Sequence, residues 1–142
     1  MENTKKSELT GAAICRKYKD LCHSTELIAL PALFGVKFYG KNEILLFRSV
    51  NSHSLKRPYW EAFLTDHTLI KLGNRVTAEK IIGRLSQDSF FQINQSHIIN
   101  RAFLSAITFK TNVCTLVEPH DKIELVISRD QLIKMREIFE IL

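Results

Sequence analysis

Short runs of apolar residues separated by turn residues occupy most of the chain from residue 28 onward. Aromatic and aliphatic residues are concentrated at positions 36–39, 43–49, 59–64 and 68–72, and polar or glycine-containing segments stand between these runs. This composition is typical of β-strands, and consecutive turns of this kind predict antiparallel pairing. Further strands are expected near residue 98 and over residues 107–110, 113–117 and 122–127.

Helical spacing occurs at three places. Residues 9–21 carry apolar and charged side chains on opposite sides, which predicts a short amphipathic helix in an N-terminal extension, residues 1–27. This helix could pack on its own domain, which we favour, or pair with a second copy. Thr77 is expected to cap a mid-chain helix whose apolar residues are spaced i, i+3, i+4 and i+7: Ala78, Ile81, Ile82 and Leu85.

Ser128 and Gln131 form the pattern of a capping box at the start of a C-terminal helix. The apolar face expected for this helix consists of Leu132, Met135, Phe139 and Leu142. Together these elements predict one mostly β domain of about nine or ten strands with small helices. Strand spacing alone would also allow a barrel.

Residues 90–101 combine core and surface signals. Phe90, Phe91, Ile93 and the pair Ile98-Ile99 are apolar, but residues 94–97 between them are polar. A fully buried strand would not tolerate four such residues without hydrogen-bond partners, so the ends are expected in the core and the middle at the surface. Asn-Gln-Ser is common turn chemistry, and amide side chains can also pair with the edge of adenine.

This segment resembles the motif of LytTR-type DNA-binding domains, the output domains of many bacterial response regulators. Phe91, Ser96, Ile99 and Asn100 fall on the pattern. Three more segments are similar in the same order: residues 42–47, the helix from Thr77, and residues 127–129. The resemblance covers residues 28–142. Basic residues that usually hold phosphate are missing at Gln92, Asn94 and Gln95, where the family carries Arg, His, and Arg or Asn.

The resemblance implies an elongated stack of small antiparallel sheets that reads double-stranded DNA through three loops. Carried over to this sequence, the first loop holds His53, Ser54, Lys56 and Arg57, and the second holds Asn94, Gln95 and Ser96. The third contact is Arg129 at the start of the C-terminal helix. Arg129 is the leading candidate because a guanidinium can bond guanine O6 and N7 together.

Charge and composition favour a polyanionic partner without identifying one. The formal net charge is +5, and residues 1–75 carry the whole excess, with 12 basic and 7 acidic residues. One positive face formed by Lys56, Arg57, Arg101 and Arg129 would support DNA binding, and ordinary solvated positions are the alternative interpretation. Tyr59 and Trp60 could stack on bases, although such a pair is more often core.

Three cysteines without metal-type spacing predict free thiols in a reducing cytoplasm, and the five scattered histidines predict ordinary surface or partly satisfied side chains. No metal site, other cofactor, signal peptide or membrane span is expected. Asp66-His67 and residues 118–121 place carboxylates beside histidines, but no nucleophile motif accompanies them, so both are interpreted as turns and no enzyme is expected.

The leading hypothesis is a stand-alone LytTR-type transcription regulator without a receiver domain. It would bind promoter repeats as a homodimer and take its signal from a protein partner, the N-terminal helix or its expression level. The first alternative is a protein-interaction module that has lost DNA reading and modulates a full-length regulator. A third hypothesis is a small β-barrel that binds single-stranded RNA through exposed aromatic side chains.

Overall fold

A computed structural model of the chain describes residues 27–51, 58–85 and 89–141. The described strands are β1 (Leu27–Ala32), β2 (Gly35–Gly40), β3 (Ile44–Val50), β4 (Tyr59–Leu64), β5 (Leu69–Lys71), β6 (Phe90–Asn94), β7 (His97–Asn100), β8 (Leu104–Thr108), β9 (Val113–Leu116) and β10 (Glu124–Val126). The helices are α2 (Ala78–Arg84) and α3 (Arg129–Ile138), with single 3-10 turns η1 (Lys41–Glu43) and η2 (Arg101–Phe103). The helix expected at residues 9–21 lies outside the described residues.

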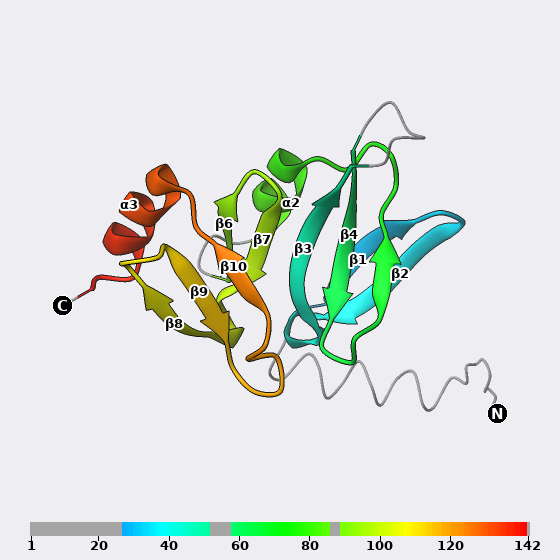
Figure 1. Cartoon of the computed structure of the whole chain (residues 1–142). Helices are drawn as coiled ribbons and strands as arrows, with labels where there is room; N and C mark the ends of the chain where they lie inside the picture. Colours follow the sequence, from blue (N-terminus) through cyan, green and yellow to red (C-terminus); the bar gives the residue numbers. More distant parts are fainter. Residues whose placement is uncertain (1–26, 52–57, 86–88, 142) are drawn as a thin grey trace.

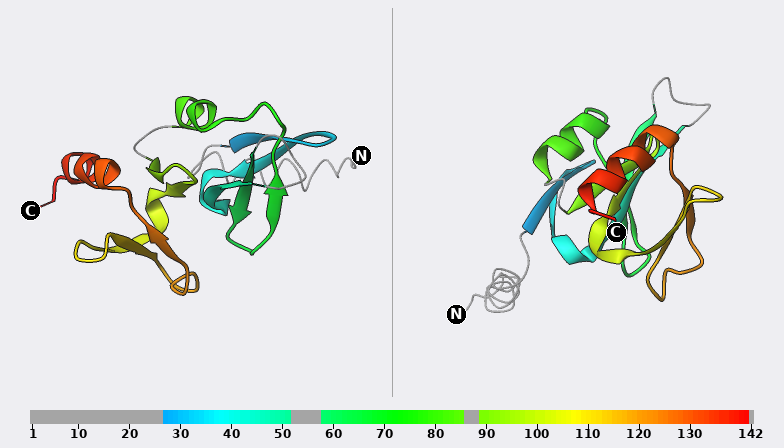
Figure 2. Two further views of the ribbon diagram at one scale, coloured as in Figure 1. Left: turned by 45° about the horizontal axis from the view of Figure 1, so that its top comes forward. Right: turned by 90° about the vertical axis from the view of Figure 1, so that its left-hand side faces the viewer.

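The strands form three antiparallel sheets rather than a barrel within this described part of the chain. The β1–β2 hairpin, a five-stranded sheet in the order β5-β4-β3-β7-β6, and a three-stranded sheet in the order β10-β9-β8 follow one another along the molecule (Figure 1). Helix α2 lies above the five-stranded sheet, and α3 lies beside the three-stranded one (Figure 2). The prediction of a mostly β fold with stacked small sheets is therefore confirmed.

The five-stranded sheet is buried on both faces, which explains why apolar residues occur in adjacent pairs along its strands. Phe90 and Ile98 pack with α2 and the β1–β2 hairpin, whereas their neighbours Phe91 and Ile99 pack with the three-stranded sheet and α3. Successive side chains of a strand point to opposite faces, so each adjacent pair contributes to two cores. The expectation that Phe90, Phe91, Ile93, Ile98 and Ile99 are core is confirmed. The polar residues between them are less buried: Gln95 is exposed, and Asn94, Ser96 and His97 are partly exposed.

Both described helices begin as expected. Thr77 Oγ1 accepts a hydrogen bond from Lys80 N at 3.2 Å, and Ser128 Oγ accepts one from Gln131 N at 3.4 Å. Only half of the predicted capping box forms, because Ser128 N donates instead to Ile93 O at 2.8 Å. Of the predicted apolar face of α3, Met135 is fully buried, whereas Leu132 and Phe139 are partly exposed; Leu142 lies outside the described residues.

Two strands differ from the sequence-based expectations. Strand β8 begins at Leu104, earlier than residue 107, and β10 is only three residues long. Trp60 is a core residue at 6% exposure, the more common role for such a pair, so it offers no stacking face. His120 is 3% exposed, packed edge-on to His67 and Phe103, with Nδ1 lacking a hydrogen-bond partner in the described structure. Of the two expectations for the histidines, surface or partly satisfied, the surface position is therefore excluded at His120.

Candidate nucleic-acid interface

The polar residues 94–97 close the β6–β7 hairpin: Gln95 and Ser96 form its two-residue turn, and Asn94, the last residue of β6, holds this turn in place. Asn94 Nδ2 donates to Val126 O at 2.6 Å, and its Oδ1 accepts from Ser96 N at 2.7 Å. His97 Nδ1 lies 3.1 Å from the same Oδ1, which suits the Nδ1–H tautomer. Both polar atoms of Asn94 are thus engaged within the protein, whereas Gln95 at the tip of the turn is exposed.

Two backbone hydrogen bonds join this turn to the other candidate loops. Ser49 N, near the end of β3, donates to Ser96 O at 2.8 Å. The bond from Ser128 N to Ile93 O, also 2.8 Å, joins the start of α3 to the end of β6. The end of β3, the 94–97 turn and the start of α3 therefore lie side by side at one end of the sheets, the upper side in Figure 1. We call this arrangement the rim.

Arg129 is the first residue of α3 and is exposed at the rim. Within the described part of the chain its guanidinium takes part in no ion pair. The N-cap bond at Ser128 and the packing of Met135 fix the direction of the helix, so the position of the Arg129 backbone is rigidly defined. A long cationic side chain on such a base can reach outward toward a polyanion.

A second cation at the rim, Arg48, was not among the candidate residues. Arg48 pairs across the strands with the buried carboxylate of Glu61, with Nε 3.1 Å from Oε1, and its side chain remains 42% exposed. Arg48 also lies opposite His97 in the neighbouring strand. Burial, followed by the charge of Arg48, lowers the pKa of His97 and favours the neutral ring. The cross-strand register identifies this cluster, and sequence spacing does not reveal it.

Arg101 does not belong to the rim. Its guanidinium lies 4.4 Å from the ring centre of Phe139, at the C-terminal end of α3. A helix of this length separates Arg101 from Arg129 by roughly 15 Å. A single positive face that includes both Arg101 and Arg129 is therefore not formed.

The remaining candidates of the first loop, His53, Ser54, Lys56 and Arg57, lie outside the described residues. The residues that flank this segment, Asn51 and Pro58, are exposed.

Asn100, which matches the family motif, has a structural role. It is 1% exposed, and its Nδ2 donates to Lys41 O at 3.0 Å and to Ile44 O at 2.9 Å. Its Oδ1 accepts from Ala102 N at 3.0 Å. The side chain therefore ties the end of β7 to the start of β3, and it faces away from solvent.

Metal and membrane chemistry receive no support from the parts of the chain that are described. They contain no group of three or more His, Cys, Asp or Glu side chains positioned to hold a metal ion. None of their helices is long and apolar enough to cross a bilayer.

Comparisons with known proteins agree with this geometry. A family model for the LytTr DNA-binding domain matches residues 36–140. The fold is similar to the LytTr DNA-binding domain of a Bacillus cereus protein described as a methyl-accepting/DNA response regulator, with a TM-score of 0.62 and 13% sequence identity. That similarity covers 83% of this chain and 100% of the other, and at this identity it concerns the fold alone. No curated protein sequence matches the chain.

Proposed function

Because the chain belongs to the LytTR DNA-binding domain family, we propose that it is a transcription regulator that binds specific double-stranded DNA sequences through the rim. The observation that carries this proposal is the pair of backbone hydrogen bonds, Ser49 N to Ser96 O and Ser128 N to Ile93 O. These bonds hold the end of β3, the β6–β7 hairpin and the start of α3, which are distant in the sequence, at one end of the molecule. Loops held on a rigid sheet can enter adjacent grooves with little further ordering.

The proposed roles differ among the rim residues. Arg129 reads a guanine through O6 and N7, and exposed Gln95 contacts an adenine edge or a phosphate oxygen. Ser96 offers a hydroxyl to phosphate, with His53 and Ser54 as further polar contacts of the first loop. Lys56 and Arg57 neutralise phosphates and contribute most of the salt dependence. Asn94 acts as a positioning residue, because its amide is already bonded to Val126 O and Ser96 N.

The test begins with selection of bound fragments from random duplex DNA. Affinity for the selected site is then measured for the wild type, Arg129→Ala and Lys122→Ala. Lys122 is an exposed cation in the turn before β10, seven residues before Arg129, so the control removes the same charge away from the rim. Arg129→Ala should weaken specific binding by about 5- to 150-fold, equivalent to about 1–3 kcal/mol for a bidentate base contact.

Nonspecific binding should change much less in Arg129→Ala, and Lys122→Ala should behave like the wild type. Equal loss of specific and nonspecific binding in Arg129→Ala would reduce its role to phosphate contact. A wild-type protein that ignores duplex DNA even at low ionic strength would refute the proposal.

In addition to the proposed DNA contact, the β1–β2 hairpin has an apolar outer face suited to contact with a protein. One face of this hairpin packs on the core through Leu30, but the opposite face presents Ala29, Pro31, Val36 and Phe38 to solvent. At its tip, Leu33 is 76% and Phe34 95% exposed. Antiparallel hairpins usually keep their outer face polar, so an outer face this apolar is typical of an interaction surface.

We propose that this hairpin face joins two copies bound at neighbouring half-sites, and that a protein partner supplying the signal is the alternative occupant. Phe38→Lys should abolish cooperative binding to a paired site while leaving affinity for one half-site unchanged. If paired-site cooperativity survives the substitution, the hairpin does not join the copies. Binding of a protein partner without any duplex binding would instead favour the interaction-module hypothesis.

A further inference from the structure

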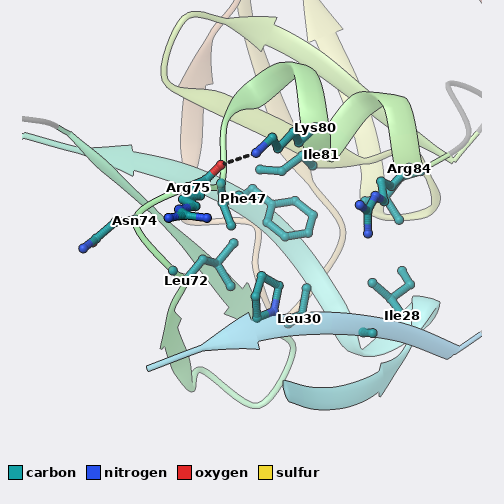
Figure 3. Close-up of a pocket in the computed structure, with 14 residues that line it drawn as sticks. Ile28, Leu30, Phe47, Leu72, Asn74, Arg75, Lys80, Ile81 and Arg84 are labelled. Carbon is teal, nitrogen blue, oxygen red and sulfur yellow. Dashed lines mark hydrogen bonds between the residues drawn. The ribbon is translucent and has the colours of Figure 1, made fainter. Parts of the chain in front are cut away.

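A cavity of about 560 Å³ lies between β1, the segment 72–76 and helix α2 (Figure 3). Its inner walls are hydrocarbon: Leu30, Phe47, Leu72 and Ile81 contribute buried side chains, and Ile28 closes one end. The backbone around the cavity is fixed, because Gly73 N donates to Pro31 O at 3.0 Å and Val76 N donates to Gly73 O at 3.1 Å. The space is thus a feature of the fold.

The mouth of this cavity is positively charged. Arg75, Lys80 and Arg84 contribute to its lining, and none of the described residues that line it is acidic. Lys80 Nζ donates to Arg75 O at 3.0 Å, which holds the ammonium at the mouth beside Arg75. Figure 3 shows Arg84 at the other end of the opening, near Ile28. The mouth therefore attracts an anion from both ends.

We propose that this cavity binds an amphiphile with a carboxylate head and a single hydrocarbon tail, that is, a fatty-acid anion. The volume falls within the ~300–1,000 Å³ range of small-molecule sites. The apolar walls disfavour a fully polar anion, because its desolvation would not be compensated inside. The cations at the mouth disfavour a neutral lipid, since they would gain no partner.

The dimensions favour a single tail over an acidic amphipathic helix. A helix is ~10 Å across with its side chains. A rigid cylinder of this width would have to fit as one body between β1, residues 72–76 and α2. A flexible hydrocarbon chain can instead follow the wall formed by Leu30, Phe47 and Leu72 with its head near Arg84 or Lys80. The inference is independent of DNA binding.

The experiment titrates the full chain with decanoate below its critical micelle concentration. Binding is followed by the fluorescence of Trp60, the single tryptophan, which packs in the same core as Phe47 and Leu72. Amide NMR shifts of residues 72–85 are recorded in parallel. Two matched probes separate the contributions: decan-1-ol keeps the tail without the charge, and butyrate keeps the charge with little tail.

Decanoate should bind saturably and shift amides around the cavity, whereas decan-1-ol and butyrate should each bind at least about tenfold more weakly. The double variant Arg75→Glu/Arg84→Glu should weaken decanoate binding about tenfold, because two exposed attractive charges become repulsive. The control Lys110→Glu/Lys122→Glu makes the same change in net charge away from the cavity and should bind as the wild type does.

Several results would overturn the proposal. These are the absence of saturable shifts near the cavity, equal affinity for decanoate and decan-1-ol, or equal weakening in both double variants. Binding of an acidic helical peptide at residues 72–85 in a protein that does not bind decanoate would also overturn it. Thermal unfolding of each variant confirms that the protein is folded, and the alcohol and butyrate comparisons on the wild type decide the outcome without any variant.

Discussion

Replacing Asn100 tests whether this residue of the family motif acts in folding rather than in contact with DNA. Asn100 is almost completely buried, and its amide makes three hydrogen bonds to backbone groups of Lys41, Ile44 and Ala102. Asn100→Ala removes all three bonds; Ile44 O and Ala102 N lose this side-chain partner, whereas Lys41 O still accepts the backbone N–H of Ile44. The end of β7 then loses its connection to the start of β3.

The expected cost follows from these three bonds. A typical internal hydrogen bond contributes about 0.5–1.5 kcal/mol net, and a buried group left without a partner costs about 1–3 kcal/mol. Two of the three bonds are only partly buried, so water can compensate some of the loss. We expect Asn100→Ala to lower the free energy of unfolding by about 2–4 kcal/mol, a large share of the about 5–15 kcal/mol typical of a domain.

The isosteric variant Asn100→Asp adds a dependence on pH. The introduced carboxylate keeps the acceptor for Ala102 N but faces the carbonyls of Lys41 and Ile44, which can only accept. Protonation restores one donor, so the folded state binds the proton more tightly than the unfolded state and the pKa of the introduced carboxyl rises. The loss of stability is therefore greatest at neutral pH and shrinks as pH falls toward the unfolded value of about 4.

Urea unfolding at pH 7 and pH 4.5 measures these effects, with Asn74→Ala as the control because Asn74 is exposed. Each variant is compared with the wild type at the same pH. A cost below about 1 kcal/mol for Asn100→Ala, or a cost equal to that of Asn74→Ala, would refute the structural role. An Asn100→Asp penalty that grows as pH falls would show that the carbonyls do not face the carboxyl.

Three further predictions concern other parts of the structure. Burial lowers the pKa of His97 and of His120; the charge of Arg48 adds to the shift at His97, and at His120 His67 adds to it while Asp121 opposes it. The free energy of unfolding should therefore fall as pH drops below about 6.5, the value for an unfolded histidine. His120→Phe should make this fall less steep in urea unfolding, and an unchanged pH dependence would contradict the prediction. Burial raises the pKa of the Cys114 thiol to about 11, so in a Cys15→Ser/Cys22→Ser background a thiol reagent at pH 8 should react only after unfolding. Arg101→Ala should cost about 0.5–1 kcal/mol of stability through its contact with Phe139, and unchanged affinity for DNA in the folded variant would confirm that Arg101 stands apart from the rim.

Much of the fold could be predicted because the informative patterns are local. Alternation and apolar runs located most strands, and Thr77 and Ser128 were recognisable as helix caps because each bonds a backbone N–H three residues later. The register shifts at Leu45 and Ile93 were not predictable, because a bulge depends on the partner strand. The same holds for the Arg48–Glu61 pair, which cross-strand packing brings together.

The candidate site, like the fold, could be predicted from the sequence only in part. The exposed position of Arg129 at a helix start follows from the amino-acid order, and so does the surface turn at residues 94–97. That Asn94 is bonded to Val126 O, and that Arg101 lies over Phe139, depends on contacts between segments more than 30 residues apart. Residue type and spacing do not show that the amide of Asn94, rather than that of Gln95, bonds a carbonyl of another strand.

The amino-acid sequence by itself determined most of the elements, the burial of the apolar ends of residues 90–101, and the family motif, because these depend on neighbours within a few positions. Only the tertiary structure decided which loops share the rim, that the hairpin keeps an apolar outer face, and that β1 and α2 enclose a cation-rimmed cavity. The physical reason is that sheet stacking brings together residues distant in the chain, and the energies of those contacts depend on geometry that no local pattern encodes.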